Sequence, residues 1–250
     1  DFDAAAVKRS SERVVDPATK SRKAVLLLGP YEACEAVDAY TVKVILKEPF
    51  APLLDSLSQV YLAIASPAAL DKWGKEYQFH QVGTGPFMMK EYVPKDHLTL
   101  VRNPDYSWGP SMHNNRGPAS VDEIEFRFYV EPAVRLLALE AGDLDIIGEI
   151  PPQDASRVEG NAQLDLVPIA IPGLPLVGFL NTAKAPTDDV LVRKALLYAT
   201  DRESIVETVF GGYSPVAVGP LSHNHVAYSS RVEGLYSYDP ETAASLLDEA

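Results

Sequence analysis

The sequence has few residues suited to covalent chemistry or to membrane insertion. Among 250 residues Cys34 is the only cysteine, so no internal disulfide can form, and its position in a strand-like run favours a buried thiol. No apolar run reaches the roughly 18 residues of a membrane span, and there is no signal peptide or initial methionine. Basic residues are outnumbered, 22 against 35 acidic ones, which gives a net charge of −13. An acidic chain does not favour nucleic acid as a partner.

Recognisable catalytic and cofactor motifs are also missing. Ser222 and His223 could be imagined in a nucleophilic triad, but the sequence has no GxSxG elbow to present such a serine. The Gly83–Gly85 turn lacks the Lys-Ser/Thr pair and the helix of a phosphate loop. His223 and His225 could share a metal ion or lie in a solvated loop, and the loop is favoured because no carboxylate or cysteine cluster flanks them. We therefore expect neither catalysis nor a cofactor.

The most informative stretch is residues 82–109, VGTGPFMMKEYVPKDHLTLVRNPDYSWG. Two strand-like runs, 87–93 and 98–102, flank a turn of the composition Pro-Lys-Asp-His, which predicts a β-hairpin. Gly83 and Gly85 precede it, and we expect this turn to use backbone angles that other residues resist.

Outside the hairpin, helix and strand patterns alternate. Capping residues begin helices at Ser66-Pro67 and Asp239-Pro240, and the pair Thr200 and Glu203 predicts a capping box. The alternation argues for an α/β fold with a mixed sheet and helices on its faces. The expected helices cover residues 1–15, 53–57, 66–74, 132–141, 151–159, 190–199 and 201–210 and one from 240. The expected strands cover 29–46 (a pair), 123–130, 144–150, 164–171 and 176–181, and residues 59–66 are expected to form a buried strand or a crossing segment.

Four ordered blocks of this sequence resemble the family 5 extracellular solute-binding proteins, the peptide- and nickel-binding receptors of ABC importers. The hairpin block carries the family's GTGPY-like turn and its RNPDYWG-like exit, with Ser107 as an insertion before Trp108. The other three blocks read DFDAAAVKRSSERVVDPAT, EAVDAYTVKVILKEPFAPLLDSL and PTDDVLVRKALLYATDRESIV.

The resemblance implies a periplasmic-binding-protein type II-like α/β fold with a small α+β extra domain. We expect residues 1–81 to form most of the extra domain, 82–200 the returning part of the main lobe, and 201–250 the start of the second lobe. Because family members are about twice this length, we interpret the chain as a middle section, truncated at both ends.

The resemblance also implies a function, which is extracytoplasmic binding of a small ligand, with a peptide favoured, for delivery to an ABC transporter permease. Nickel or another non-peptide solute is the alternative within the class, and a ligand-presenting sensor or chaperone-like receptor is the alternative outside it. The expected location is periplasmic or extracellular, with a membrane anchor in the full-length protein.

The resemblance suggests few ligand contacts within this chain. Asn181 matches an asparagine that contacts the ligand backbone in oligopeptide-binding relatives, although a strand-end turn residue fits equally well. Gln59 and Tyr61 are further candidates, at the rim of a cleft. Arg193 and Asp201 fit a structural ion pair or a helix cap. The family's Asp and Arg anchors for peptide termini lie beyond Ala250 by position, and an incomplete second lobe favours self-association of this piece.

Overall fold

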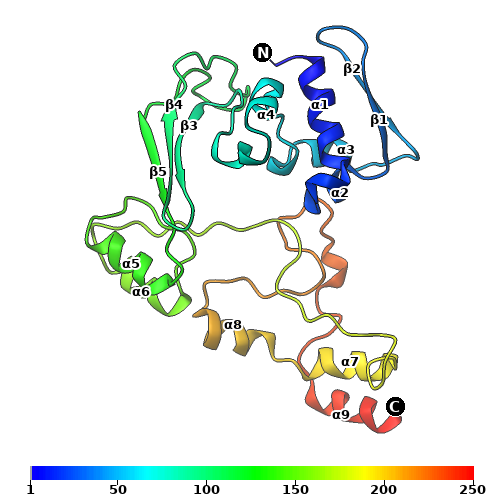
Figure 1. The fold of residues 1–250 in the computed structure, drawn as a ribbon. Coiled ribbons are helices and arrows are strands. Elements are labelled where there is room, and N and C mark those ends of the chain that lie inside the picture. Colours follow the sequence, from blue (N-terminus) through cyan, green and yellow to red (C-terminus); the bar gives the residue numbers. More distant parts are fainter. Residues whose placement is uncertain (1) are drawn as a thin grey trace. The chain divides into compact units, whose positions relative to one another are not determined.

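A computed structural model describes residues 2–250, which form two compact units, the first ending at Tyr129 and the second comprising Val130–Ala250 (Figure 1). Within residues 2–250, none of the helices combines the length and the hydropathy of a membrane span. The elements of the first unit are α1 (Ala4–Val15), α2 (Lys23–Leu28), β1 (Tyr31–Ala36), β2 (Val42–Leu46), α3 (Leu53–Leu57), α4 (Pro67–Trp73), β3 (Phe87–Val93), β4 (His97–Arg102) and β5 (Glu123–Arg127), and those of the second are α5 (Pro132–Glu140), α6 (Pro152–Glu159), α7 (Val190–Ala199), α8 (Arg202–Phe210) and α9 (Pro240–Glu249).

The amino-terminal part of the first unit packs helices against a two-stranded antiparallel sheet. Asp3 caps α1 by accepting a hydrogen bond from the Ala6 amide at 2.8 Å. β1 and β2 pair as the expected hairpin, which buries Cys34 opposite Val44. A small apolar core lies beneath α2, and its buried members are Ala24, Leu28 and Leu62.

The Ser66-Pro67 start signal is confirmed. The Ser66 hydroxyl accepts a hydrogen bond from the Ala69 amide at 3.3 Å, and Pro67 occupies the first position of α4. The preceding segment, 59–66, is not the buried strand or crossing segment that the sequence suggested. It begins with a 3-10 turn, Val60–Leu62, in which Leu62 faces the core while Val60 and Tyr61 are exposed. One buried residue in three fits the period of a 3-10 turn and explains why the apolar run was misread.

β3, β4 and β5 form a three-stranded antiparallel sheet with β4 in the middle (Figure 1). Its register places Tyr92, Leu98 and Phe126 in one row, on the apolar face of the sheet. The ring of Phe79 stacks on Tyr92 from this side, with centroids 5.7 Å apart. Because side chains alternate along strands, the other face carries charged residues from all three strands. This division of the two faces positions the charged pocket described below.

The second unit is built mainly from helices. α7 and α9 lie side by side (Figure 1), and the carbonyl of Tyr198 at the end of α7 accepts a hydrogen bond from the Asp239 amide at the start of α9. Asp239 is the N-cap of α9, as its sequence predicted. Leu136 of α5 and Val158 of α6 are the most completely buried large side chains of the described chain.

Three predicted strands of the second unit are absent. Residues 144–150, 164–171 and 176–181 contain no assigned strand. A strand requires a neighbouring strand to take up its backbone hydrogen bonds, and none pairs with these segments within residues 2–250. Their apolar side chains are correspondingly exposed: Ile146, Val167, Ile169, Ile171, Leu176 and Phe179.

The predicted capping box at α8 is also corrected. Asp201, rather than Thr200, is the N-cap, and its carboxylate accepts hydrogen bonds from the Ser204 amide at 3.0 Å and from the Ser204 hydroxyl at 2.7 Å. The Thr200 hydroxyl instead donates to the carbonyl of Leu196 at 2.6 Å, which closes the end of α7. An aspartate and a threonine side by side both suit a cap, so composition alone did not distinguish them.

Candidate functional site

Asn181 begins a tightly bonded loop in the second unit. Its side-chain oxygen accepts a hydrogen bond from the Ala183 amide at 3.0 Å, and its backbone oxygen accepts one from the Thr187 hydroxyl at 2.8 Å. The first bond is the Asx-turn geometry of a residue at a strand end or turn. The residue is exposed, and its side-chain nitrogen donates to nothing in the described chain. That N–H group is therefore available to an external acceptor such as a carbonyl or a carboxylate.

The loop that carries Asn181 is held by the first turns of α7. The Arg193 guanidinium donates from Nη1 to the carbonyls of Thr187 at 2.8 Å and Asp188 at 2.9 Å. Asp189 caps the helix by accepting a hydrogen bond from the Leu191 amide at 2.6 Å. Arg193 thus has a structural role, but through hydrogen bonds to backbone carbonyls rather than through the ion pair or helix cap that the sequence suggested.

Gln59 and Tyr61 lie together in the first unit, on the 3-10 turn after α3. Both are exposed, and buried Leu62 anchors the turn on which they sit. The Lys23 ammonium lies 5.8 Å from the centroid of the Tyr61 ring, within the range of a cation–π contact. The structure thus brings Gln59 and Tyr61 together on an accessible surface, and it places Asn181 in the other unit.

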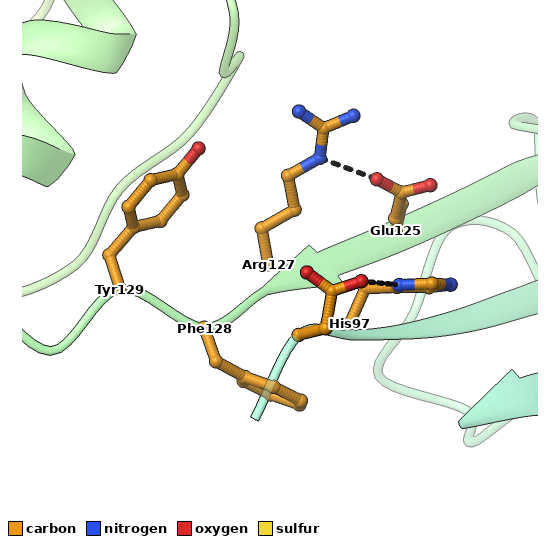
Figure 2. Close-up of a pocket in the computed structure, with 6 residues that line it drawn as sticks. His97, Glu125, Arg127, Phe128 and Tyr129 are labelled. Atoms are coloured by element: carbon orange, nitrogen blue, oxygen red, sulfur yellow. Dashed lines mark hydrogen bonds and ion pairs between the residues drawn. The ribbon is translucent and has the colours of Figure 1, made fainter. Parts of the chain in front are cut away.

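A pocket that sequence reasoning missed lies on the charged face of the three-stranded sheet (Figure 2). It has a volume of about 420 Å³ and is lined by Asp96, His97, Glu125, Arg127, Phe128 and Tyr129. Arg127 and Glu125 point to the same side of β5, joined by a 2.5 Å ion pair, and Phe128 points to the opposite side (Figure 2). The alternating charges along 123–127 could have indicated a charged face of this strand. Only the strand register shows that His97 lies on the same face, opposite Arg127.

The Gly-rich turn before β3 is braced by side chains from the exit of β4. The Asn103 amide donates to the carbonyl of Gly85 at 3.0 Å, and the Trp108 indole donates to the carbonyl of Thr84 at 3.1 Å. Neither Gly83 nor Gly85 has a positive φ, so the expectation that glycine torsions define this turn is wrong. A Cβ on Gly83 would meet nothing within 4 Å, and one on Gly85 only a backbone oxygen at 4.0 Å. The side chains of Asn103 and Trp108 hold the backbone of this turn through hydrogen bonds, which we call the brace.

Ser222 serves as a brace as well. Its hydroxyl accepts a hydrogen bond from the Gly173 amide at 2.9 Å and lies 2.9 Å from the side-chain oxygen of Asn224. The His223 ring lies against Tyr228, with ring centroids 4.6 Å apart. Ser222 thus holds the backbone at Gly173 through hydrogen bonds, which is a structural role.

Two further residues were candidates for reactive or metal chemistry, Cys34 and His225. Cys34 is buried, and burial raises the pKa of its thiol, which disfavours the reactive thiolate. The His225 Nδ1 accepts a hydrogen bond from the Ala227 amide at 3.0 Å. Across residues 2–250 no group of three or more His, Cys, Asp or Glu side chains is arranged to hold a metal ion.

Comparison with known proteins gives one consistent result. Residues 1–250 match the family model described as "Bacterial extracellular solute-binding proteins, family 5 Middle". The glutathione-binding protein GsiB of Escherichia coli (strain K12) is 34% identical over 251 aligned residues, which span the whole of this chain and 47% of GsiB. The chain therefore spans about half the length of the curated relatives it matches.

Solved structures agree with the sequence comparison. The binding protein AgaA of A. tumefacien R10 in complex with agropinic acid has a TM-score of 0.77 and 30% identity, covering 99% of this chain and 48% of AgaA. NikA from Brucella suis in complex with Fe(III)-EDTA has a TM-score of 0.76 and 29% identity, covering 99% of this chain and 49% of NikA.

Proposed function

The chain belongs to the bacterial extracellular solute-binding proteins of family 5, and on that premise we propose that it is the middle part of a receptor that binds a small ligand for an ABC importer. Its fold is of the periplasmic-binding-protein type II class, with mixed helices and sheets. The observation that carries the proposal is the match of the family model over the entire chain. The family is one of binding proteins, and we extend that property to this chain as an absence of catalytic turnover.

The favoured ligand is a small peptide or a peptide-like acid. GsiB binds glutathione, which is itself a short peptide, and AgaA binds agropinic acid. The exposed Asn181 amide supports this class, because an N–H donor on a rigid loop suits a carbonyl or carboxylate acceptor. In the receptor, Gln59 and Tyr61 would contribute to the rim of the binding cleft, and closure of two lobes would enclose the ligand.

A metal complex is the second candidate ligand. NikA from Brucella suis is a relative of similar identity, and its structure holds Fe(III)-EDTA. A chelator already fills coordination positions of its metal with its own donor atoms, so this candidate needs no cluster of metal-binding side chains in the protein. The two candidates therefore predict different molecules in the same cleft.

Native mass spectrometry of the intact protein, purified from its own cells without denaturation, tests the proposal. The expected result is a bound species of low mass, present at one per protein, that is released as a peptide or peptide-like acid. A released metal chelate would favour the second candidate. Turnover of a peptide by the pure protein would refute the proposal of a binding function.

Membership of the family supports a proposal for the location and the partners of the complete protein. Family 5 proteins are extracellular or periplasmic, and we propose that the complete protein is held at the membrane and meets an ABC transporter permease. Genes for a permease and an ATPase beside its own would support import. A neighbouring sensor kinase without a permease would favour the alternative, a receptor that presents its ligand to a sensor.

Residues 1–250 produced alone are proposed to self-associate. The segments 164–171 and 176–181 expose apolar side chains along their length, Ile169 and Leu176 among them. Large exposed apolar surfaces on a protein in water tend to find a partner. Sedimentation velocity over a range of concentrations tests this, and a monomer at every concentration would rule it out.

A further inference from the structure

The turn between β3 and β4 lies where all three strands of the sheet meet. His97, the first residue of β4, pairs with Val93 of β3 on one side and with Arg127 of β5 on the other. The Phe128 amide donates to the carbonyl of Asp96 at 2.9 Å, which ties the end of β5 to the turn. A change in the protonation or position of His97 therefore affects its contacts with both β3 and β5.

A β-bulge in β3 directs a second carboxylate towards this histidine. The register shifts between Met89 and Glu91, so that Glu91 lies opposite Thr99. Because residues two apart along β4 share a face, Glu91 becomes the diagonal neighbour of His97. Re-aiming one side chain is a common consequence of a bulge.

Both ring nitrogens of His97 face a carboxylate. The Nδ1 atom lies 2.7 Å from Asp96 Oδ2, and the Nε2 atom lies 3.3 Å from Glu91 Oε2. The side chain of His97 is only 22% exposed, whereas those of the two acids reach well into solvent. His97 lines the pocket, and Figure 2 shows it below the Arg127–Glu125 pair.

The chemistry of imidazole makes this arrangement depend on pH. A protonated ring has two N–H groups and can donate to both carboxylates, whereas a neutral ring has one donor and one acceptor. In the neutral form one ring nitrogen would present its lone pair to a carboxylate oxygen, which repels it. The contact with Glu91 is the longer one, so it is the one expected to open.

We propose that Asp96, His97 and Glu91 form a pH-operated clasp, which fastens the β3–β4 turn to β3 when His97 is protonated and releases it when His97 is neutral. The proposal does not depend on the ligand of the receptor. The hydrogen bonds to Asp96 and Glu91 raise the pKa of His97 above its ordinary value of about 6.5. The other charged groups facing the ring come from β5: Glu125, which favours protonation, and Arg127, which is already paired with Glu125.

The sign of the pH dependence follows from this raised pKa. While Asp96 and Glu91 are ionised, the clasp contributes its full stability below the unfolded-state His97 pKa of about 6.5, and that contribution is lost as pH rises through the raised folded-state pKa. Its opening also removes one positive charge from the pocket lining, which leaves Asp96 and Glu125 opposed by Arg127 alone.

NMR titration of the intact protein, with the histidine side chains labelled with ¹⁵N, tests the clasp directly. The expected results are a His97 pKa above about 6.5 and, above that pKa, a neutral ring that carries its proton on Nδ1, facing Asp96. Asp96→Asn should lower the pKa more than Glu91→Gln, and the double variant should lower it further than either. Glu32→Gln removes an exposed acid from the separate β1–β2 sheet and should leave the His97 pKa unchanged.

Hydrogen exchange supplies the second readout. Protection of the Asp96 and Phe128 amides, corrected for the intrinsic rate, should fall as pH rises through the His97 pKa in the wild type. In Glu91→Gln this pH-dependent loss should disappear, because the side chain that the clasp holds no longer carries a charge. A His97 pKa at or below the ordinary value, or protection that is the same on both sides of the transition, would overturn the proposal.

Discussion

The brace between Asn103 and the Gly-rich turn gives the sharpest test of how the hairpin region is held. Asn103→Ala removes two side-chain hydrogen bonds, one donated to the Gly85 carbonyl at 3.0 Å and one accepted from the Asp105 amide at 3.2 Å. A hydrogen bond of this kind contributes about 0.5–1.5 kcal/mol to stability. Because Asn103 is only partly buried, water replaces some of the loss, and we expect about 1–2 kcal/mol in the free energy of unfolding.

Urea unfolding followed by tryptophan fluorescence measures this loss selectively. The only two tryptophans, Trp73 and Trp108, both lie in the first unit, so the signal reports its unfolding. With a slope of about 2 kcal/mol per molar, the midpoint should fall by about 0.5–1 M at an unchanged slope. Asn114→Ala, in the same loop but without a hydrogen bond of its own in the described chain, is the matched control and should not move the midpoint.

The same experiment distinguishes the brace from a glycine-dependent turn. Gly85→Val should change stability by less than about 0.5 kcal/mol, because Gly85 has an ordinary φ and open space at its Cβ position. A large loss in Gly85→Val together with an unchanged midpoint in Asn103→Ala would refute the reasoning. That result would mean that backbone torsions, rather than side-chain hydrogen bonds, define the turn.

Three further predictions concern other parts of the chain. Gly29→Ala should lower the free energy of unfolding by about 2–4 kcal/mol, because Gly29 has a φ of +68° and an added Cβ would lie 2.7 Å from the Phe50 ring. Urea unfolding measures this loss, and an unchanged midpoint would contradict the prediction. Cys34 should react with iodoacetamide on the order of 100-fold more slowly in the native protein than in urea, because burial raises the pKa of its thiol; equal rates would show an open thiol. Asp201→Ala should destabilise α8 at neutral pH, because hydrogen bonds from the Ser204 backbone and side chain lower the pKa of this N-cap carboxylate. The stabilisation by the cap is lost as pH falls through the folded-state pKa, so the difference in helix stability between the variant and the wild type should narrow as pH falls below about 4. Thermal unfolding followed by circular dichroism at pH 2 and pH 7 measures this difference, and an equal difference at both pH values would contradict the prediction.

Local features of the fold could be predicted from sequence where the signal is short-range. Ser66 and Asp239 cap their helices, and the strands on either side of 94–96 pair as a hairpin. Each of these depends on residues within a few positions of one another. The segments 164–171 and 176–181 were misassigned because strand formation depends on distant partners, which an apolar pattern does not specify.

The candidate site was predictable to a smaller extent. The family resemblance selected Asn181, and the structure adds that its amide nitrogen is available on a fixed loop. The charged pocket was missed because its lining comes from the β3–β4 turn and from β5, which strand register alone brings together. The bulge that aims Glu91 at His97 leaves no recognisable pattern in the sequence, so this cluster could be found only in three dimensions.

Calorimetric titration of the intact protein tests the central claim most directly. The ligands are glutathione, short linear peptides and a nickel–histidine complex, each titrated against the wild type and Asn181→Ala. We expect one-to-one binding of a peptide ligand with a Kd on the order of micromolar or tighter, weakened about 5- to 30-fold in Asn181→Ala by loss of about 1–2 kcal/mol. Binding of the nickel complex alone, or of no small ligand at all, would contradict a peptide receptor.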